Sequence, residues 1–128
     1  MWQFLAGLAR QLPAEAAHKL AVETLRWRIG PRPPAGHAST GLRVSLAGLD
    51  FSNPLGLAAG FDKNAACYEG ALRLGFGHVE VGTITPLPQA GNPKPRVFRL
   101  PEDQAVINRY GFSGKGMYAA ARNLRRRQ

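Results

Sequence analysis

Residues 53–64 read NPLGLAAGFDKN, an apolar run with small side chains where a core strand would carry large ones. A buried strand favours Val, Ile and Phe, whereas Ala58, Ala59 and Gly60 let a flat or bulky group lie directly against the backbone. Lys63 then places an ammonium group just past the end of the strand. The run therefore predicts a strand that ends at a ligand-binding edge.

The segments that follow alternate between strand and helix patterns. We expect a buried strand over 54–60, then a helix over 64–75 that ends in a left-handed cap at Gly75. A second strand is expected over 78–85, and a long insertion precedes a helix over 113–127. This order is the start of a parallel α/β array, whose sites lie at the carboxyl ends of the strands. Two parallel strands do not close a barrel, so we expect the chain to be the N-terminal part of a longer protein.

Three further segments have shorter or weaker patterns. Residues 42–54 predict a small hairpin that turns at Ala47 and Gly48, and residues 96–100 predict a short extended segment. Residues 102–112 carry no single pattern.

Residues 2–28 predict two helices that break at Pro13, and residues 31–41 form a linker rich in Pro and Gly. Trp2, Phe4 and several cations are typical of a helix pair that lies on a membrane surface. A helical hairpin packed on the protein's own core is the alternative, which the sequence alone somewhat favours. The second helix is expected to bury one face and to leave Glu15 off it; that face carries Ala17, Leu20, Ala21, Thr24 and Leu25.

Charge is strongly positive, because 17 Lys and Arg residues against 8 Asp and Glu give a formal net charge of +9 over 128 residues. A cluster of arginines near the C-terminal end is typical of a solvated helix end. It consists of Arg122, Arg125, Arg126 and Arg127. No aromatic residues alternate with this cluster, as a stacking platform for single-stranded nucleic acid requires, so we expect no nucleic-acid partner.

Cysteine and histidine are sparse. Cys67 is the only cysteine, and we expect it to fill a small core position. The three histidines are scattered without metal-ligand spacing, so we expect neither a disulfide nor a metal site. No apolar run approaches the roughly 18–20 residues of a transmembrane helix, and no signal-peptide pattern is present.

Two groups of residues could carry chemistry at the strand ends. Ala59, Gly60, Lys63 and Thr83 should converge in a parallel sheet, and their small walls, hydroxyl and ammonium suit a planar, partly anionic group. A flavin ring and a sugar phosphate both fit that description. A solvated lysine and tight strand–helix packing are the plain alternatives.

The second group is the run INRYGF at residues 107–112. Asn108 offers a donor and an acceptor that suit an amide or imide edge, and Arg109 adds a charge. The same spacing is also ordinary turn chemistry, and the sequence pattern does not separate the two.

Taken together, NPLGLAAGFDKN, GFGHVEVGTITPLPQAGNPKPRVFRLPEDQAVINRYGF and the helical extension resemble the start of a dihydroorotate dehydrogenase of the quinone-dependent, membrane-associated class. The resemblance covers residues 53–112 and, more loosely, 14–25. It implies a flavin-bearing (β/α)8 barrel preceded by a small helical domain that contacts the membrane. Residues 1–30 would form the helical domain, 31–41 the linker and 42–128 the start of the barrel.

The resemblance also implies site residues by motif. FMN would be held by Ala59, Gly60, Phe61, Asp62, Lys63 and Thr83. The pyrimidine, dihydroorotate or orotate, would be held by Lys63, Asn108, Arg109, Tyr110, Gly111 and Phe112. A quinone tunnel would be lined by His18 and Arg99.

The activity implied is oxidation of (S)-dihydroorotate to orotate, with a quinone as the final acceptor, in the synthesis of pyrimidines and UMP. A base removes the C5 proton while C6 delivers hydride to the flavin. That base would be a serine beyond Gln128, so no catalytic residue is expected in these 128 residues and no turnover by them alone. This sequence has Ser113 and Gly114 where the family commonly has Asn, so a contact from that amide is not expected.

The implied location is peripheral, at the cytoplasmic face of a bacterial inner membrane or at the mitochondrial inner membrane, with residues 1–28 on the lipid. Two alternatives remain open from the sequence. One is a non-catalytic remnant that binds a partner or a membrane. The other is a different flavin-barrel oxidoreductase, against which the contiguous runs at 96–104 and 107–112 argue.

Overall fold

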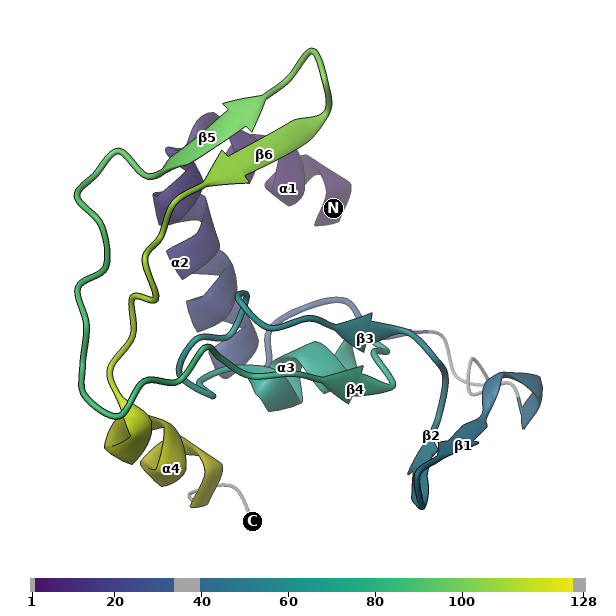
Figure 1. The fold of residues 1–128 in the computed structure, drawn as a ribbon. Coiled ribbons are helices and arrows are strands. Elements are labelled where there is room, and N and C mark those ends of the chain that lie inside the picture. The colour runs from purple at the N-terminus through teal and green to yellow at the C-terminus, as the bar shows by residue number, and fades with distance from the viewer. Residues whose placement is uncertain (1, 34–39, 126–128) are drawn as a thin grey trace.

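The structure is a computed structural model that describes residues 2–33 and 40–125 (Figure 1). The helices are α1 (Trp2–Gln11), α2 (Ala14–Arg26), α3 (Tyr68–Arg73) and α4 (Met117–Arg125), with a 3-10 turn at Thr40–Leu42. The strands are β1 (Val44–Leu46), β2 (Leu49–Phe51), β3 (Gly56–Leu57), β4 (His78–Val79), β5 (Val97–Leu100) and β6 (Ala105–Asn108). The described chain is therefore mixed α/β, and the predicted break between the first two helices at Pro13 is confirmed.

Helix α2 connects the two halves of the described chain. Near its start it contacts α1 and the β5–β6 hairpin, and near its end it contacts α3 (Figure 1). Helix α3 approaches closely because Gly70 has no side chain: a Cβ placed there would lie 2.0 Å from the carbonyl oxygen of Leu25. Leu25 is buried at this crossing, as predicted.

The predicted inner face of α2 is wrong in part. The sequence pattern places Leu20 on the packed face, but this residue is 52% exposed. The same pattern places Glu15 outside the packed face, yet it lies on the inner side, where its carboxylate binds Arg96. The reason is that an ion pair with Arg96, directly before β5, orients the start of the helix, which a count of apolar positions alone does not reveal.

Strands β3 and β4 pair in parallel, as predicted, with Gly56 opposite His78 and Leu57 opposite Val79. They are much shorter and less buried than the expected strands over 54–60 and 78–85. The ladder ends because the chain leaves it after Leu57, and residues 58–60 are exposed.

The helix predicted over 64–75 begins only at Tyr68. Residues 64–67 instead wrap around the buried carboxylate of Asp62. Cys67 is buried as expected, but it immediately precedes the helix. Gly75 has a φ of 110°, so the predicted left-handed residue at the end of this helix is confirmed.

The first hairpin, β1–β2, is confirmed with its turn at Ala47 and Gly48, which have φ values of 52° and 78°. The second hairpin is only half predicted by the sequence, because β5 is expected but its antiparallel partner β6 is not. The last helix begins at Met117 rather than at 113, since Gly114 is held extended in a bridge to Gln89.

Two sequence predictions fall wholly or partly outside the described residues. Most of the linker, at 34–39, lies outside them, as do Arg126 and Arg127 of the basic cluster. Arg122 and Arg125 are exposed in the last turn of α4, as expected for a solvated helix end. Among the helices described, none combines the length and the apolar character that crossing a bilayer requires.

Candidate functional site

The ends of the two parallel strands meet, as predicted. The backbone N–H of Gly60 donates to the carbonyl of Gly82 over 2.7 Å, and the N–H of Gly82 donates to the carbonyl of Asp62 over 2.9 Å. Ala59 and Thr83 are exposed beside these bonds, and a Cβ placed on Gly60 would have no atom within 4 Å. The structure thus leaves an open edge lined by backbone and small side chains.

Lys63 joins this edge to the run at residues 107–112. Its ammonium donates to the carbonyl of Gly60 and lies 4.2 Å from the centre of the Tyr110 ring. Burial lowers the pKa of Lys63, and the nearby Arg96 guanidinium lowers it further. Lys63 of the first group and Tyr110 of the second group singled out in the sequence therefore meet at this edge.

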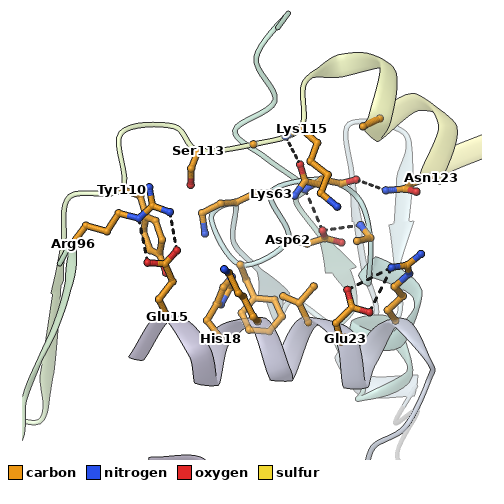
Figure 2. Close-up of a pocket in the computed structure, with 18 of the residues that line it drawn as sticks. Glu15, His18, Glu23, Asp62, Lys63, Arg96, Tyr110, Ser113, Lys115 and Asn123 are labelled. Atoms are coloured by element: carbon orange, nitrogen blue, oxygen red, sulfur yellow. Dashed lines mark hydrogen bonds and ion pairs between the residues drawn. The ribbon is translucent and has the colours of Figure 1, made fainter. Parts of the chain in front are cut away.

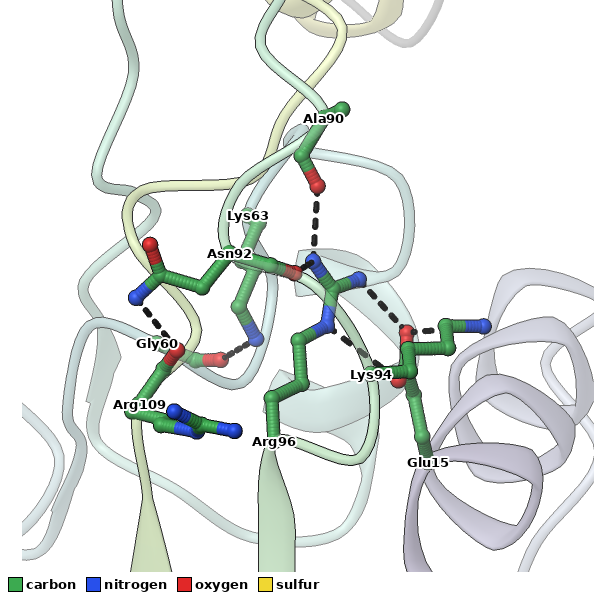
Figure 3. Close-up of polar contacts among 8 residues, drawn as sticks. All are labelled: Glu15, Gly60, Lys63, Ala90, Asn92, Lys94, Arg96 and Arg109. Atoms are coloured by element: carbon green, nitrogen blue, oxygen red, sulfur yellow. Dashed lines mark hydrogen bonds and ion pairs between the residues drawn. The ribbon is translucent and has the colours of Figure 1, made fainter.

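Arg96 lies against the Tyr110 ring and pairs with Glu15, and neither residue is predicted from the sequence to belong to the site. Arg96 is only 8% exposed, and its guanidinium forms a two-pronged ion pair with the carboxylate of Glu15 (Figure 3). The hydrogen bonds from Arg96 hold the pKa of Glu15 below its ordinary value. No local pattern could have revealed the pair, because 81 residues separate its members.

His18 and Arg99, the predicted tunnel residues, line one cavity of about 620 Å³. Arg99 donates to the carbonyls of Arg10 and Leu12, which ties β5 to the end of α1. The ring of His18 packs edge-on against Phe61, with 5.1 Å between ring centres. Much of the wall is apolar, with Ala14, Ala17, Ala21, Val97 and Val106.

A second cavity, of about 660 Å³, opens between α2, the loop at 61–66 and α4 (Figure 2). Its wall is mostly polar, and it carries cations from several elements: Lys19, Arg26, Lys94, Lys115 and Arg122. Four residues line both cavities: His18, Phe61, Lys63 and Tyr110. These four side chains therefore separate a polar cavity from a more apolar one.

The resemblance implies that Asp62 contacts FMN. In the structure its side chain binds the backbone of its own loop. The residue is 1% exposed, and its carboxylate accepts the backbone N–H groups of Asn64, Ala66 and Cys67 at 3.3, 2.8 and 2.7 Å. All three hydrogen bonds to the carboxylate therefore come from the loop that directly follows Asp62. We therefore assign the Asp62 side chain a structural role, which is to hold the loop that presents Lys63.

The remaining residues of the run at 107–112 diverge. Asn108 lies at the end of β6 and lines the apolar cavity. Arg109 turns toward the neighbouring loop, where its guanidinium donates to the carbonyl of Pro95 over 3.1 Å. Gly111 and Phe112 have φ values of 69° and 56°, and this left-handed bend leaves Phe112 largely exposed.

The neighbouring residues complete the polar side. Ser113 and Gly114 line the polar cavity. Among the residues that the structure describes, no three His, Cys, Asp or Glu side chains gather as metal ligands would.

Comparisons with known proteins agree with the resemblance in the sequence. A family model described as dihydroorotate dehydrogenase matches residues 41–128. Mouse mitochondrial dihydroorotate dehydrogenase (quinone) is 52% identical over 124 residues, which are 97% of this chain and 31% of that protein. The dihydroorotate dehydrogenase (quinone) of Rhodopseudomonas palustris strain TIE-1 is 56% identical over 119 residues, or 91% of this chain and 32% of that protein.

A solved structure is also similar. The Eimeria tenella DHODH in complex with ferulenol superposes with a TM-score of 0.84 at 45% identity, covering 89% of this chain and 30% of that one. The chain thus spans about a third of the length of the curated relatives named above.

Replacing Asp62 by Asn tests its structural role. The new side-chain amide would turn an N–H₂ group toward a backbone N–H, so we expect Asp62→Asn to lower the free energy of unfolding by about 2–4 kcal/mol. Urea denaturation measures the change. The matched control is Asp50→Asn on the exposed β2 strand, where we expect a change of about 0.5 kcal/mol or less. Equal stability of the two variants would contradict the structural role.

The stability of the protein should depend on the protonation of His18. Burial, and then the Lys63 ammonium, lower the pKa of His18 from its ordinary 6.5. The folded state therefore takes up a proton less readily than the unfolded chain, and stability falls as the pH drops through about 6.5. His18→Gln should flatten this decline between about pH 7.5 and 5.5, by less than about 1.4 kcal/mol per pH unit because His18 is only partly buried. Urea unfolding across this range measures how the free energy of unfolding changes with pH. An unchanged pH dependence in His18→Gln would show that His18 is not its cause.

Proposed function

Because the chain belongs to the dihydroorotate dehydrogenase family, we propose that it forms part of a quinone-dependent enzyme that oxidises dihydroorotate to orotate in pyrimidine synthesis. The matched relatives are about three times as long as this chain, so the proposal concerns the whole protein to which these residues contribute. In that protein, residues 1–30 would form a helical domain, 31–41 a linker and 42–128 the start of a (β/α)8 barrel. The parallel β3–β4 pair around α3 supports the barrel.

One observation carries the proposal: the same side chains border a polar and an apolar cavity. A charged pyrimidine requires a polar site, and a quinone requires an apolar one. Lys63 and Tyr110 face both cavities, so an electron carrier placed at this wall would reach both substrates.

The open edge at the strand ends fits FMN. Ala59, Gly60 and Thr83 are small enough for a flat ring to lie against the backbone, and Lys63 offers an ammonium beside it. When bound, FMN supplies the hydride acceptor and the route for electrons to the quinone. The protein aligns the reactants and stabilises negative charge.

The pyrimidine would be held from the same place. Lys63 would pair with its negative charge at the wall between the two cavities, which Tyr110 also lines and which Asn108 borders from the apolar side. Arg109, Gly111 and Phe112 would complete the pocket. The carboxylate of Asp62 is not part of this proposal. The serine that serves as the base is proposed to lie outside these 128 residues.

The quinone would enter between the helices and the β5–β6 hairpin. His18 and Arg99 line the cavity there, and Arg99 also anchors the end of α1. We propose that residues 1–28 lie on the membrane that supplies the quinone, which places the protein peripherally on a bacterial or mitochondrial inner membrane. Phe4 and Leu8 support this, because they lie four residues apart on one face of α1 and are 70% and 54% exposed. Leu12, directly after the helix, is 40% exposed.

Replacing Lys63 tests the activity. In the protein expressed from the complete reading frame, Lys63→Ala should lower kcat/KM for dihydroorotate about a hundredfold or more, since a positioned charge is lost. Dihydroorotate-dependent reduction of a quinone analogue measures the rate. Arg43→Ala, an exposed cation just before β1 that lines neither of the two cavities, serves as the control and should stay close to the parent activity.

Two outcomes would contradict the proposal. One is a protein with bound FMN that does not oxidise dihydroorotate. The other is a stop codon directly after the codon for Gln128, which would leave a non-catalytic remnant in place of an enzyme with a serine base and a glycine-rich phosphate loop. The 128 residues alone should not reduce a dye with dihydroorotate, and dye reduction would contradict a base outside them.

Membrane attachment is tested on α1. Removing two large apolar side chains in Phe4→Ser/Leu8→Ser should weaken binding to lipid vesicles at least about tenfold, since each contributes roughly 1–2 kcal/mol when buried in lipid. Cosedimentation with phosphatidylcholine vesicles measures the loss. The control is Leu46→Ser/Leu49→Ser on the β1–β2 hairpin, whose side chains are similarly exposed. Equal binding by both variants would show that α1 is not the contact.

A further inference from the structure

Glu15 and Arg96 tie helix α2 to the base of the β5–β6 hairpin. The guanidinium Nη2 donates to Oε1 of Glu15 over 2.7 Å, and Nε donates to Oε2 over 3.2 Å. Both side chains are largely buried. Such a two-pronged pair fixes the orientation of the guanidinium plane as well as its position.

The other side of Arg96 is fixed by the loop that precedes it. Its Nη1 donates to the carbonyls of Ala90 and Asn92 over 2.7 and 3.1 Å (Figure 3). Asn92 in turn donates its backbone N–H to the carbonyl of Tyr110 over 2.9 Å and its side-chain amide to the carbonyl of Arg109 over 2.8 Å. The guanidinium and the backbone of Tyr110 therefore belong to one hydrogen-bonded unit.

Two cations contact the Tyr110 ring. The guanidinium carbon of Arg96 lies 5.1 Å from the ring centre, and the ammonium of Lys63 lies 4.2 Å from it. Both distances are within the range of cation–π attraction. Two cations so close to one ring repel each other, and the Glu15 carboxylate compensates the charge of the buried one. Figure 2 shows Glu15, Arg96, Tyr110 and Lys63 along one side of the polar cavity.

We propose that Glu15 is a positioning residue for Lys63: it holds Arg96, Arg96 holds the Tyr110 ring, and the ring holds the ammonium above the strand end. The importance of Lys63 rests on the function proposed above. The inference adds that α2, which lines the apolar cavity, also sets the place of the lysine that faces the polar one. The polar and the apolar cavity thus both depend on the position of α2.

Several charged and titratable groups face Lys63, and they act in opposite directions. Burial and Arg96 lower the pKa of Lys63, whereas the carboxylates of Glu15 and Asp62 raise it. His18 lies nearby and is itself affected by the lysine. Removing the charge of Glu15 should therefore lower the pKa of Lys63 further, whatever happens to the ring.

NMR measures the position of the Tyr110 ring separately. The sample is protein expressed from the complete reading frame, with its lysines labelled with 13C at Cε. Lys63→Arg assigns the Lys63 signal by removing it. Tyr110→Leu then measures how far the aromatic ring shifts the Cε protons. We expect Glu15→Gln to move the Lys63 signal most of the way to its position in Tyr110→Leu, and to lower the pKa of Lys63. The same replacement in Glu102→Gln, in the exposed turn between β5 and β6 and outside both cavities, should leave the signal in place.

Two results would overturn the inference. A Lys63 signal that does not move in Glu15→Gln would show that the ring stays in place without the carboxylate. A lower pKa with an unchanged ring contribution would show that Glu15 acts through its charge alone. If Glu15→Gln does not fold, Arg96→Lys carries the test, because it keeps the charge and loses the fork. It should show the same loss of the ring contribution, and the absence of that loss would refute the inference.

Orotate and kinetics separate this inference from the proposed function. Added to the FMN-loaded protein, orotate should shift the Lys63 signal, and Glu15→Gln should lower kcat/KM for dihydroorotate about tenfold, equivalent to about 1.4 kcal/mol. If orotate has no effect while Glu15→Gln still displaces the lysine, the proposed function fails and the positioning role stands. If orotate shifts the signal and Glu15→Gln does not, the reverse holds.

Discussion

Burying the guanidinium of Arg96 is the constraint around which the described structure is arranged. A buried cation is costly unless an anion and further acceptors surround it. Glu15 supplies the anion, and the carbonyls of Ala90 and Asn92 supply the acceptors. These partners come from a helix and from a loop distant in sequence. The α2 helix, the loop and the β5–β6 hairpin are therefore held together by one side chain, in a protein whose apolar core is small.

The open edge of the candidate site results from the shortness of the two parallel strands. β3 and β4 pair over two residues each, and their continuations are tied by single backbone bonds at Gly60 and Gly82. Small residues keep this edge open, while the loop after it is stabilised internally by Asp62. The loop after Asp62 is therefore held by its own hydrogen bonds, while the backbone at residues 58–60 stays exposed. Among the described residues, four side chains line both the polar and the apolar cavity, so the two cavities lie next to each other.

Local features were predictable from sequence because their causes are local. Pro13 breaks the helix pair, Ala47 and Gly48 turn the first hairpin, and Gly75 takes a left-handed conformation. The meeting of the strand ends was also predictable, since parallel pairing brings carboxyl ends to one edge. The partnership of Glu15 with Arg96 was not, because a charge on a helix gives no sign of a partner 81 residues away. The bonds of the Asp62 carboxylate to its own loop were not predictable for a related reason: an acid beside a binding edge looks the same in sequence whether it faces a ligand or its own backbone.

The separation of Glu15 from Arg96 has a consequence for the order of events on the ribosome. The helix pair precedes the hairpin in the chain, so it leaves the exit tunnel before the hairpin that will hold it exists. During that interval the carboxylate stays in water and the helices have only each other to pack against. The contact between Glu15 and Arg96 can therefore form only after the hairpin has been synthesised, so the joining of α2 to the hairpin is a late step in the folding of these residues.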